Sequence, residues 1–309
     1  MKTDKISSLR TEGRNAASAH LDLRSPLEIA RIINREDEKI AGAVRRALPV
    51  ISRAIEAIAK ALLHGGRLIY VGAGTSGRIA ALDAAECPPT FGLSPRLVQY
   101  VIAGGKEALG RAAEYDEDSR RAGVHDIRRR HLTRADVVVG LAASGRTPYT
   151  VAAVEYARRH GVMTVAVTSS PGSPLARAAR IPIVVGTGPE VVAGSTRMKA
   201  GTAQKMVLNM LTTGAMARLG YVYGNQMVNV HTGNRKLLER GLGILQRCEG
   251  CERKQALRML RRSRGSVSVA LVALKASIMP ETARELLKQT HGNVRAALQN
   301  ASRRSRKRR

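Results

Sequence analysis

Residues 68–92, LIYVGAGTSGRIAALDAAECPPTFG, predict the centre of the fold. An apolar, β-prone run (68–71) is followed by a turn with three glycines and then by a helix-forming run. Parallel sheets bind anions with this order of strand, glycine-rich loop and helix, because the helix start offers free N–H groups and a partial positive charge. Thr75 and Ser76 would add hydroxyl donors. We therefore expect a phosphate-bearing small molecule to bind here.

The same loop matches G-x-G-x-x-G, the pattern of dinucleotide-binding proteins. That class also needs an acidic residue at the end of the second strand, about 20 residues on, to hold the ribose. Here the second strand is expected at 97–103 and runs into Gly104 and Gly105 with no acid at its tip. The pattern therefore favours a phosphorylated small molecule over a dinucleotide.

The chain alternates between strand and helix patterns over most of its length. Apolar, β-prone runs predict five strands at 68–71, 97–103, 136–141, 162–167 and 181–185. Helical patterns lie between them or follow them at 78–85, 107–130, 148–159 and 198–219. Two earlier helices are expected at 25–34 and 36–63, the second kinked or divided by Pro49. The fold class is therefore α/β, a doubly wound parallel five-stranded sheet with N-terminal helices.

An internal repeat with a period of 27 residues predicts a separate C-terminal module. ALRMLRRSRGSVSVAL (256–271) aligns with ARELLKQTHGNVRAAL (283–298), and each copy is expected to form a helix, a glycine turn and a second helix. We predict a small helical, UBA-like module there. The predicted domains are an N-terminal helical segment (1–57), the α/β domain (58–222), the helical module (223–300) and a basic disordered tail (301–309).

Composition limits the protein class. The chain has 309 residues, and only 3% of them are aromatic, so the core must be aliphatic. No apolar run reaches the ~20 residues of a membrane span, and the N-terminus lacks the apolar core of a secretory signal. We expect a cytoplasmic protein that does not associate with membranes. Three cysteines do not make a disulfide framework, and the lone Cys248-x-x-Cys251 lacks a second pair of zinc ligands.

The formal net charge is +28, and the chain ends in the basic run SRRSRKRR (302–309). Such a run can bind nucleic acid nonspecifically. Arginine far outnumbers lysine throughout the chain, so we favour a general arginine bias over nucleic-acid binding as the function. The excess positive charge would in either case attract anionic ligands.

Three loops that follow predicted strands share the same chemistry. Each is rich in hydroxyls, contains glycine and opens a helix; the loops are 74–77, 144–147 and 193–197. In an open α/β sheet, ligands bind beyond the C-terminal ends of the strands. Ordinary helix caps would explain one such loop, but three together favour a site for a phosphorylated polyol. The expected substrate-binding residues are Gly74, Thr75, Ser76, Gly77, Ser144, Gly145, Arg146, Thr147, Ser195, Thr196 and Lys199.

Several blocks of the sequence resemble one known family. They are GAGTSGR and DAAECPPTFG within 72–92, LAASGRTPY (141–149), EVVAGSTRMKAGTAQKMVLNMLTTGAM (190–216) and LDLRSPLEIARIINRED (21–37). Together they resemble the N-acetylmuramic acid 6-phosphate etherases, which belong to the sugar isomerase (SIS) superfamily and are related to the glucokinase regulatory protein. The resemblance extends from Thr11 to Leu298.

The resemblance implies cleavage of the D-lactyl ether of N-acetylmuramic acid 6-phosphate in cell-wall recycling, without a metal or an organic cofactor. It places the catalytic acid at Glu86, in ECPPTFG, and a second catalytic carboxylate at Glu117, in EDS. Contacts to phosphate and sugar are implied at Ser76, Ser144 and Thr147. Family members bind substrate at a dimer interface, so a homodimer is implied as well.

The residues around the two glutamates agree with opposite catalytic roles. Glu86 lies between alanines and Cys87-Pro88-Pro89, a setting expected to desolvate it and favour its neutral form. Glu117 lies in an acidic run that also contains Glu114, Asp116 and Asp118, which by itself is typical of a solvated helix face. The resemblance favours catalysis over that interpretation.

Two other functions fit the same loops. A sugar-phosphate-sensing regulator of the glucokinase regulatory protein type would keep the loops and lack turnover. An aldose–ketose isomerase would also remove a proton from C2 but would not need ECPPTFG. Intact Glu86 and Glu117 favour the etherase.

Overall fold

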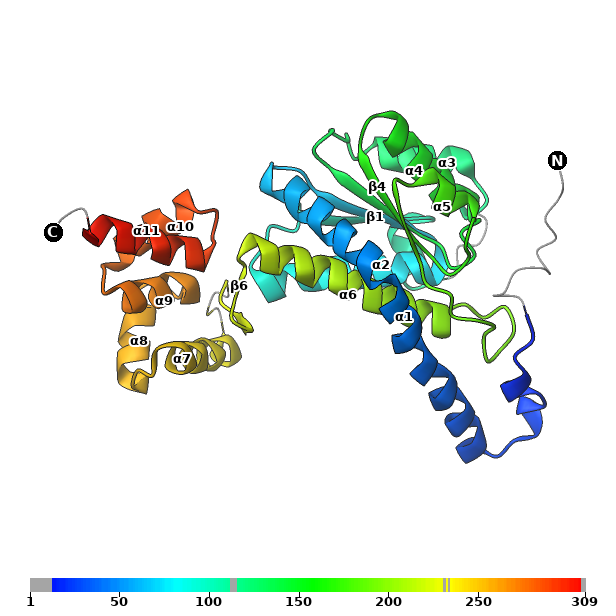
Figure 1. The fold of residues 1–309 in the computed structure, drawn as a ribbon, viewed down its shortest axis with the longest axis horizontal. Helices are drawn as coiled ribbons and strands as arrows, with labels where there is room; N and C mark the ends of the chain where they lie inside the picture. Colours follow the sequence, from blue (N-terminus) through cyan, green and yellow to red (C-terminus); the bar gives the residue numbers. More distant parts are fainter. Residues whose placement is uncertain (1–12, 112–115, 230–231, 233, 307–309) are drawn as a thin grey trace. The chain divides into compact units, whose positions relative to one another are not determined.

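The computed structural model describes residues 13–111, 116–229, 232 and 234–306 (Figure 1). The chain divides into two compact units. Unit 1 lies within residues 1–85 and 95–212, and unit 2 within residues 86–94 and 213–309. The helices α2 (Gly74–Phe91) and α6 (Lys199–Leu219) run from one unit into the other.

Unit 1 is built on a parallel five-stranded sheet in the order β2-β1-β3-β4-β5, which confirms the predicted fold class. The strands are β1 (Leu68–Gly72), β2 (Val98–Ile102), β3 (Val137–Leu141), β4 (Met163–Thr168) and β5 (Ile181–Val184). In the register, Gly72 at the end of β1 pairs with Ile102 on one side and with Leu141 on the other. The carboxyl ends of β1 and β3, where two of the three predicted ligand loops begin, are therefore neighbours.

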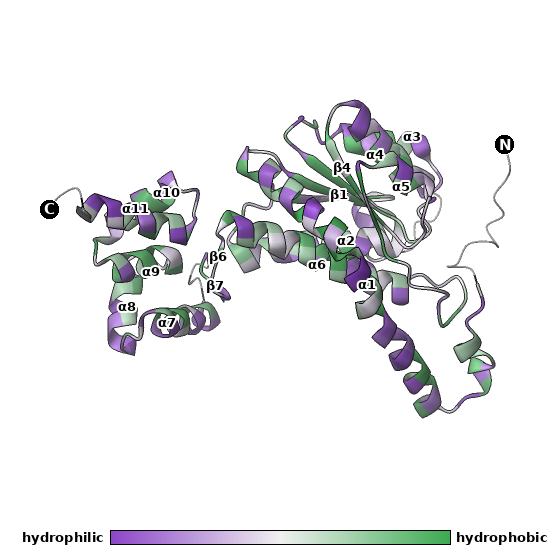
Figure 2. Ribbon diagram, viewed as in Figure 1, coloured by the Kyte–Doolittle hydropathy of each residue, from purple (hydrophilic) through white to green (hydrophobic). Residues whose placement is uncertain are grey.

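Helices cover both faces of the sheet. In Figure 1, α1 (Pro26–Leu63), α2 and α6 lie on one face. The other face carries α3 (Arg120–Arg128), α4 (Pro148–Arg159) and α5 (Pro174–Ala178). Figure 2 shows green, hydrophobic strands between helices with purple outer faces. The core on the second face consists of Val, Ile, Ala and Leu with the buried Tyr149, in line with the aliphatic core expected from composition.

Helix α1 is longer than predicted. It is a single helix of 38 residues that begins with a capping box between Ser25 and Glu28. Two helices were expected, with Pro49 kinking or dividing the second, but the structure has one helix, and Pro49 does not divide it. Proline removes one backbone hydrogen bond, and here the apolar side of the helix continues across it through the buried Ala47 and Ile51.

Two further predictions of helix boundaries were wrong. One helix was expected over 107–130, but the structure has a 3₁₀ helix (Gly105–Leu109) and then α3, with residues 112–115 outside the described ranges. Gly110 ends the first segment, and Ser119 caps the second by accepting from Ala122 N. Helix α2 continues to Phe91, past the predicted end near residue 85, and contains both Pro88 and Pro89.

Unit 2 contains the predicted helical repeat. Helices α8 (Arg253–Arg262) and α9 (Val267–Ala276) form one copy, and α10 (Pro280–Gln289) and α11 (Val294–Arg306) form the other. Gly265 and Gly292 occupy equivalent turns with φ of +77° and +85°, a region that glycine adopts without strain. Helix α7 (Arg235–Glu249) and a short hairpin of β6 (Val222–Tyr223) and β7 (Gln226–Met227) complete the unit.

The basic tail differs from the prediction of disorder. Residues 301–306 continue α11, and Ala301 is buried in the core of unit 2. Residues 307–309 lie outside the described part of the chain. Within the described residues, no helix is both long enough and apolar enough to cross a membrane.

Candidate functional site

The glycine-rich loop after β1 is built by close packing. A methyl group added at Gly77 would lie 2.5 Å from the Ile102 side chain, so glycine is required for α2 to approach β2. Gly74 has a φ of +50°, in the left-handed region. Thr75 and Ser76 lie in the first turn of α2, where backbone N–H groups precede the first helical hydrogen bonds. The loop therefore places backbone N–H groups and two hydroxyls at one helix start, with Ser76 buried and Thr75 half-buried.

The loop after β3 packs against the end of β4 and the loop that follows it. A methyl group at Gly145, whose φ is +66°, would lie 2.1 Å from Ser173 Oγ and 2.7 Å from Thr168 Oγ1. Leu175 N also donates to Gly145 O at 2.9 Å. Within the loop itself, Arg146 N donates to Ser144 Oγ at 3.3 Å.

Thr147 is the N-cap residue of α4, but its side chain makes no capping hydrogen bond. Thr75 and Ser76 lie inside α2, so they do not cap that helix either. The hydroxyl of Thr147 is thus not an ordinary helix cap, which was the alternative to ligand binding.

Glu117 connects the two loops. Its backbone oxygen accepts from Tyr149 N, in the first turn of α4, at 3.0 Å. Its carboxylate reaches the start of α2, because Glu117 Oε1 lies 2.8 Å from the position a methyl group would take at Gly74. Glu117 is half-buried and lies before α3, so it does not belong to a solvated helix face. Glu114, in the same acidic run, lies outside the described residues.

Lys199 does not lie where a substrate ligand was expected. Its ammonium is buried, with 2% of the residue exposed, and Nζ donates to Glu36 Oε2 at 2.6 Å and to Pro189 O at 2.9 Å. This pairing favours a structural role for Lys199 over the predicted contact with substrate.

The helix start that follows the third loop is also occupied. The Glu190 carboxylate accepts from Lys199 N and Ala200 N, both at 2.9 Å. An anion is favoured at a helix N-terminus, and here the protein supplies its own. Burial raises the pKa of Glu190, and the two N–H groups oppose this rise only in part. Ser195 and Thr196 remain half-buried in the loop, so their hydroxyls stay candidate ligands.

Glu36 was not predicted as part of any site. Burial would raise the pKa of its carboxyl, but hydrogen bonds from Lys199, Lys39 and Asn15 outweigh it and lower the pKa to about 2. The sequence carries one signal for it, since Glu36 lies between the buried Ile32 and Ile40 at helical spacing. A charged residue in an apolar helix stripe indicates a buried partner.

Glu86 lies on α2 within unit 2, and its side chain is exposed. The expectation that neighbouring residues desolvate it is therefore not met within the described residues of this chain. The helix that carries it is fixed one turn earlier: the Asp83 carboxylate accepts from Tyr70 OH at 2.8 Å and from Thr212 Oγ1 at 3.2 Å. Burial raises the pKa of Asp83, and the two hydroxyl donors counteract this only in part. The catalytic role of Glu86 stays a prediction.

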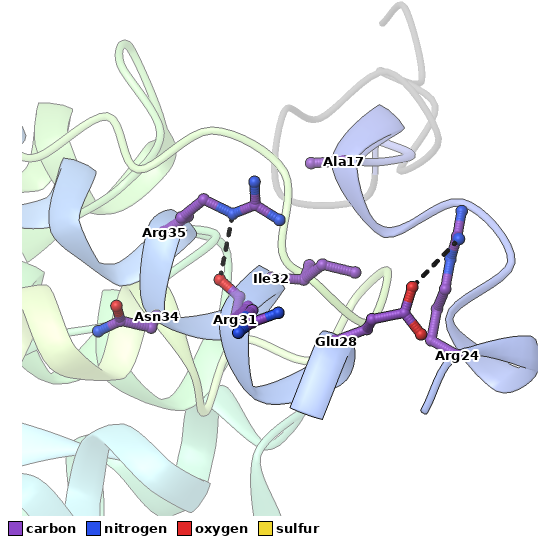
Figure 3. A pocket seen from close by; sticks show the side chains of 7 residues that line it. All are labelled: Ala17, Arg24, Glu28, Arg31, Ile32, Asn34 and Arg35. Atoms are coloured by element: carbon purple, nitrogen blue, oxygen red, sulfur yellow. Dashed lines mark hydrogen bonds and ion pairs between the residues drawn. The ribbon is translucent and has the colours of Figure 1, made fainter. Parts of the chain in front are cut away.

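Other features of the described residues are separate from these loops. A cleft of about 510 Å³ lies beside the first turns of α1, and Figure 3 shows the Arg24–Glu28 ion pair and the Arg35 bond to Arg31 O at its edge. It includes none of the predicted site residues. Among the described residues, no group of three His, Cys, Asp or Glu side chains is placed to hold a metal ion.

Comparisons with known proteins cover nearly the whole chain. Residues 50–158 match the glucokinase regulatory protein N-terminal SIS domain, and residues 123–214 match the SIS domain. An N-acetylmuramic acid 6-phosphate etherase of Symbiobacterium thermophilum is 56% identical over 274 residues, 89% of this chain and 91% of the relative. Proteins with the same name from Pasteurella multocida and Clostridium beijerinckii are 49% and 46% identical, over 95% and 97% of this chain and 97% and 98% of their own lengths.

Proposed function

We propose that this chain, which belongs to the N-acetylmuramic acid 6-phosphate etherase family, cleaves the D-lactyl ether of N-acetylmuramic acid 6-phosphate. The products are N-acetylglucosamine 6-phosphate and D-lactate, and the pathway is amino-sugar recycling from the cell wall. The observation that carries the proposal is an identity of 46–56% to named etherases over 89–97% of the chain.

An ether has a poor leaving group, so direct displacement is slow, and elimination is the easier route. When the sugar ring opens, the C1 aldehyde makes the C2 hydrogen acidic. A base removes this proton, and the electron pair of the C2–H bond forms the C2=C3 double bond as the C3–O bond breaks. An acid protonates the departing lactyl oxygen. Water then adds across the double bond, its oxygen at C3 and a proton at C2.

This chemistry needs two carboxyl groups in opposite protonation states. We assign the base at C2 to Glu117 and the acid at the lactyl oxygen to Glu86, the glutamate of ECPPTFG. The position of the Glu117 carboxylate against Gly74 supports its assignment, because it lies at the loop proposed to hold the substrate. The assignment of Glu86 rests on its motif.

For the phosphosugar, we propose contacts from the starts of α2 and α4. Ser76, Ser144 and Thr147 would donate hydroxyl hydrogen bonds to phosphate or sugar, and the first N–H groups of α2 would add to them. Support comes from the hydroxyl of Thr147, which does not cap α4. The side chains of Ser195 and Thr196 would contact the ligand from the third loop.

We further propose a homodimer in the cytoplasm, with α1 and α6 contributing to the interface. Leu48 and Leu63 on α1 are large apolar side chains with 43% and 58% exposure, which a second copy would cover. Static light scattering at micromolar concentration measures this, and a fully active monomer would contradict it.

The activity is tested by D-lactate release from purified protein and N-acetylmuramic acid 6-phosphate, followed with a coupled lactate dehydrogenase. We expect the wild-type protein to release D-lactate and variants at Glu86 or Glu117 to release far less. A protein that binds the sugar phosphate but releases no lactate would instead be a regulator of the glucokinase regulatory protein type, whose N-terminal SIS domain the chain also matches.

A further inference from the structure

Three buried charged residues meet at the third loop. Glu36 comes from α1, Glu190 follows β5, and Lys199 begins α6, and these residues are 3%, 0% and 2% exposed. Buried charges are rare unless they are paired, because leaving water is costly. These residues lie next to a loop that carries the candidate substrate contacts Ser195 and Thr196, which suggests that they position this loop.

The third loop and its flanking residues, 190–198, are held at both ends by contacts of these charged residues. At its start, Glu190 accepts from the N–H groups of Lys199 and Ala200. At its end, Lys199 Nζ reaches back to Pro189 O and across to Glu36 Oε2. Lys199 therefore joins the two ends of the loop to each other and fastens them to α1.

Asn15 repeats the contacts of the lysine. Its Nδ2 donates to Glu36 Oε2 at 2.9 Å and to Pro189 O at 3.3 Å, the same two oxygens that Lys199 Nζ contacts. We call Asn15, Glu36 and Lys199 the Glu36 clamp. Lys39 also pairs with Glu36, on the other carboxylate oxygen, from an exposed position.

The loop and the glycine-rich loop both border Gly201, in the first turn of α6. Gly201 N donates to Thr196 O at 3.0 Å. A methyl group at Gly201 would lie 3.5 Å from Thr196 O and 3.6 Å from Thr75 Cγ2, so the two loops lie on either side of this glycine at the start of α6. A shift in the loop ends would move Ser195 and Thr196 relative to Thr75.

We propose that the Glu36 clamp is a positioning device that fixes loop 190–198 against the glycine-rich loop, so that the bound phosphosugar depends on residues that do not touch it. The inference rests on the proposed function in taking a phosphosugar as the ligand and Ser195 and Thr196 as contacts to it. It assigns a role in ligand binding to the N-terminal segment, through Asn15, and to α1, through Glu36.

The test uses Lys199→Met and Asn15→Ala in the full chain, with Lys60→Met as a matched control at an exposed position of α1. Two quantities are measured: amide hydrogen exchange across 190–198 in the free protein, and the Kd for N-acetylglucosamine 6-phosphate by calorimetry. Neither requires turnover, so an inactive wild-type enzyme would refute the proposed activity without deciding the clamp.

For Lys199→Met we expect exchange across 190–198 to rise at least tenfold and Kd to rise about tenfold. Asn15→Ala should change both in the same direction by about two- to threefold, since it leaves the ion pair intact, and Lys60→Met should match the wild type. Wild-type exchange in Lys199→Met would overturn the proposal, and so would faster exchange with unchanged Kd. If Lys199→Met does not fold, Asn15→Ala decides: raised exchange and Kd support the clamp, and unchanged values overturn it.

Discussion

Replacing Gly74 by alanine tests whether the Glu117 carboxylate works at the glycine-rich loop. The added methyl group would lie 2.8 Å from Glu117 Oε1 and 3.8 Å from its Cδ. Because the carboxylate is the end of a flexible side chain, the methyl group will displace the carboxylate and leave the loop folded. The variant therefore displaces the proposed base and keeps its charge.

The size of the effect follows from two terms. The φ of +50° at Gly74 costs an alanine roughly 1 kcal/mol of folding free energy. Ordinary van der Waals contact begins at 3.4 Å, so the oxygen must retreat by 3.4 minus 2.8, about 0.6 Å. A displacement of about 1 Å can reduce catalysis about 100-fold. We therefore expect kcat to fall about 10- to 100-fold and the melting temperature to fall by a few degrees.

Gly105→Ala is the matched control. Gly105 has a φ of +66°, and a methyl group there would have no atom within 4 Å. It carries the same kind of backbone strain without contact to the site. The assay is D-lactate release at saturating and limiting substrate, with thermal unfolding of both variants. If Gly74→Ala keeps a kcat within twofold of Gly105→Ala, the Glu117 carboxylate is not the base at that loop.

Two further predictions concern binding and stability. Ser144→Ala should raise KM about 5- to 30-fold, equivalent to about 1–2 kcal/mol for a lost hydrogen bond to phosphate, and an unchanged KM with unchanged kcat would remove Ser144 from the site. Asp136 is 1% exposed and accepts hydrogen bonds from Arg67 and from Thr133 N. Asp136→Asn should lower the free energy of unfolding by about 2–4 kcal/mol at pH 7. Burial would raise its pKa, but those hydrogen bonds hold the pKa below its usual value, so this stability is present above about pH 4 and is lost as the pH falls through the folded-state pKa. Denaturant unfolding at several pH values should therefore show the gap between wild type and Asp136→Asn narrowing below about pH 4, and a constant gap would contradict the pairing.

The sheet and the glycine-rich loop after β1 could be predicted from the sequence because their signals are local. The run 68–71 lies within β1, and the glycines after it are required by packing against Ile102. The helical repeat was equally readable, since Gly265 and Gly292 recur at a fixed period and both have positive φ. In each case the residues that carry the signal also make the local structure.

The buried pairing of Lys199 could not be predicted, because its partner lies 163 residues away in the sequence. A lysine directly after a hydroxyl-rich loop resembles a phosphate ligand, and only the fold brings α1 to the start of α6. The predictions of helix boundaries failed for a similar reason. Pro49 does not break α1, because tertiary packing of its apolar side outweighs the local preference of proline.

In the proposed mechanism, two glutamates divide the elimination between them. The most direct test follows exchange of the C2 hydrogen with deuterated solvent, together with D-lactate release, in the Glu117→Gln and Glu86→Gln variants. Glu117→Gln should lose exchange, and Glu86→Gln should retain exchange while lactate release falls at least ~10²-fold. Loss of exchange in Glu86→Gln with retention in Glu117→Gln would reverse the roles, and near-normal lactate release in both variants would contradict the mechanism.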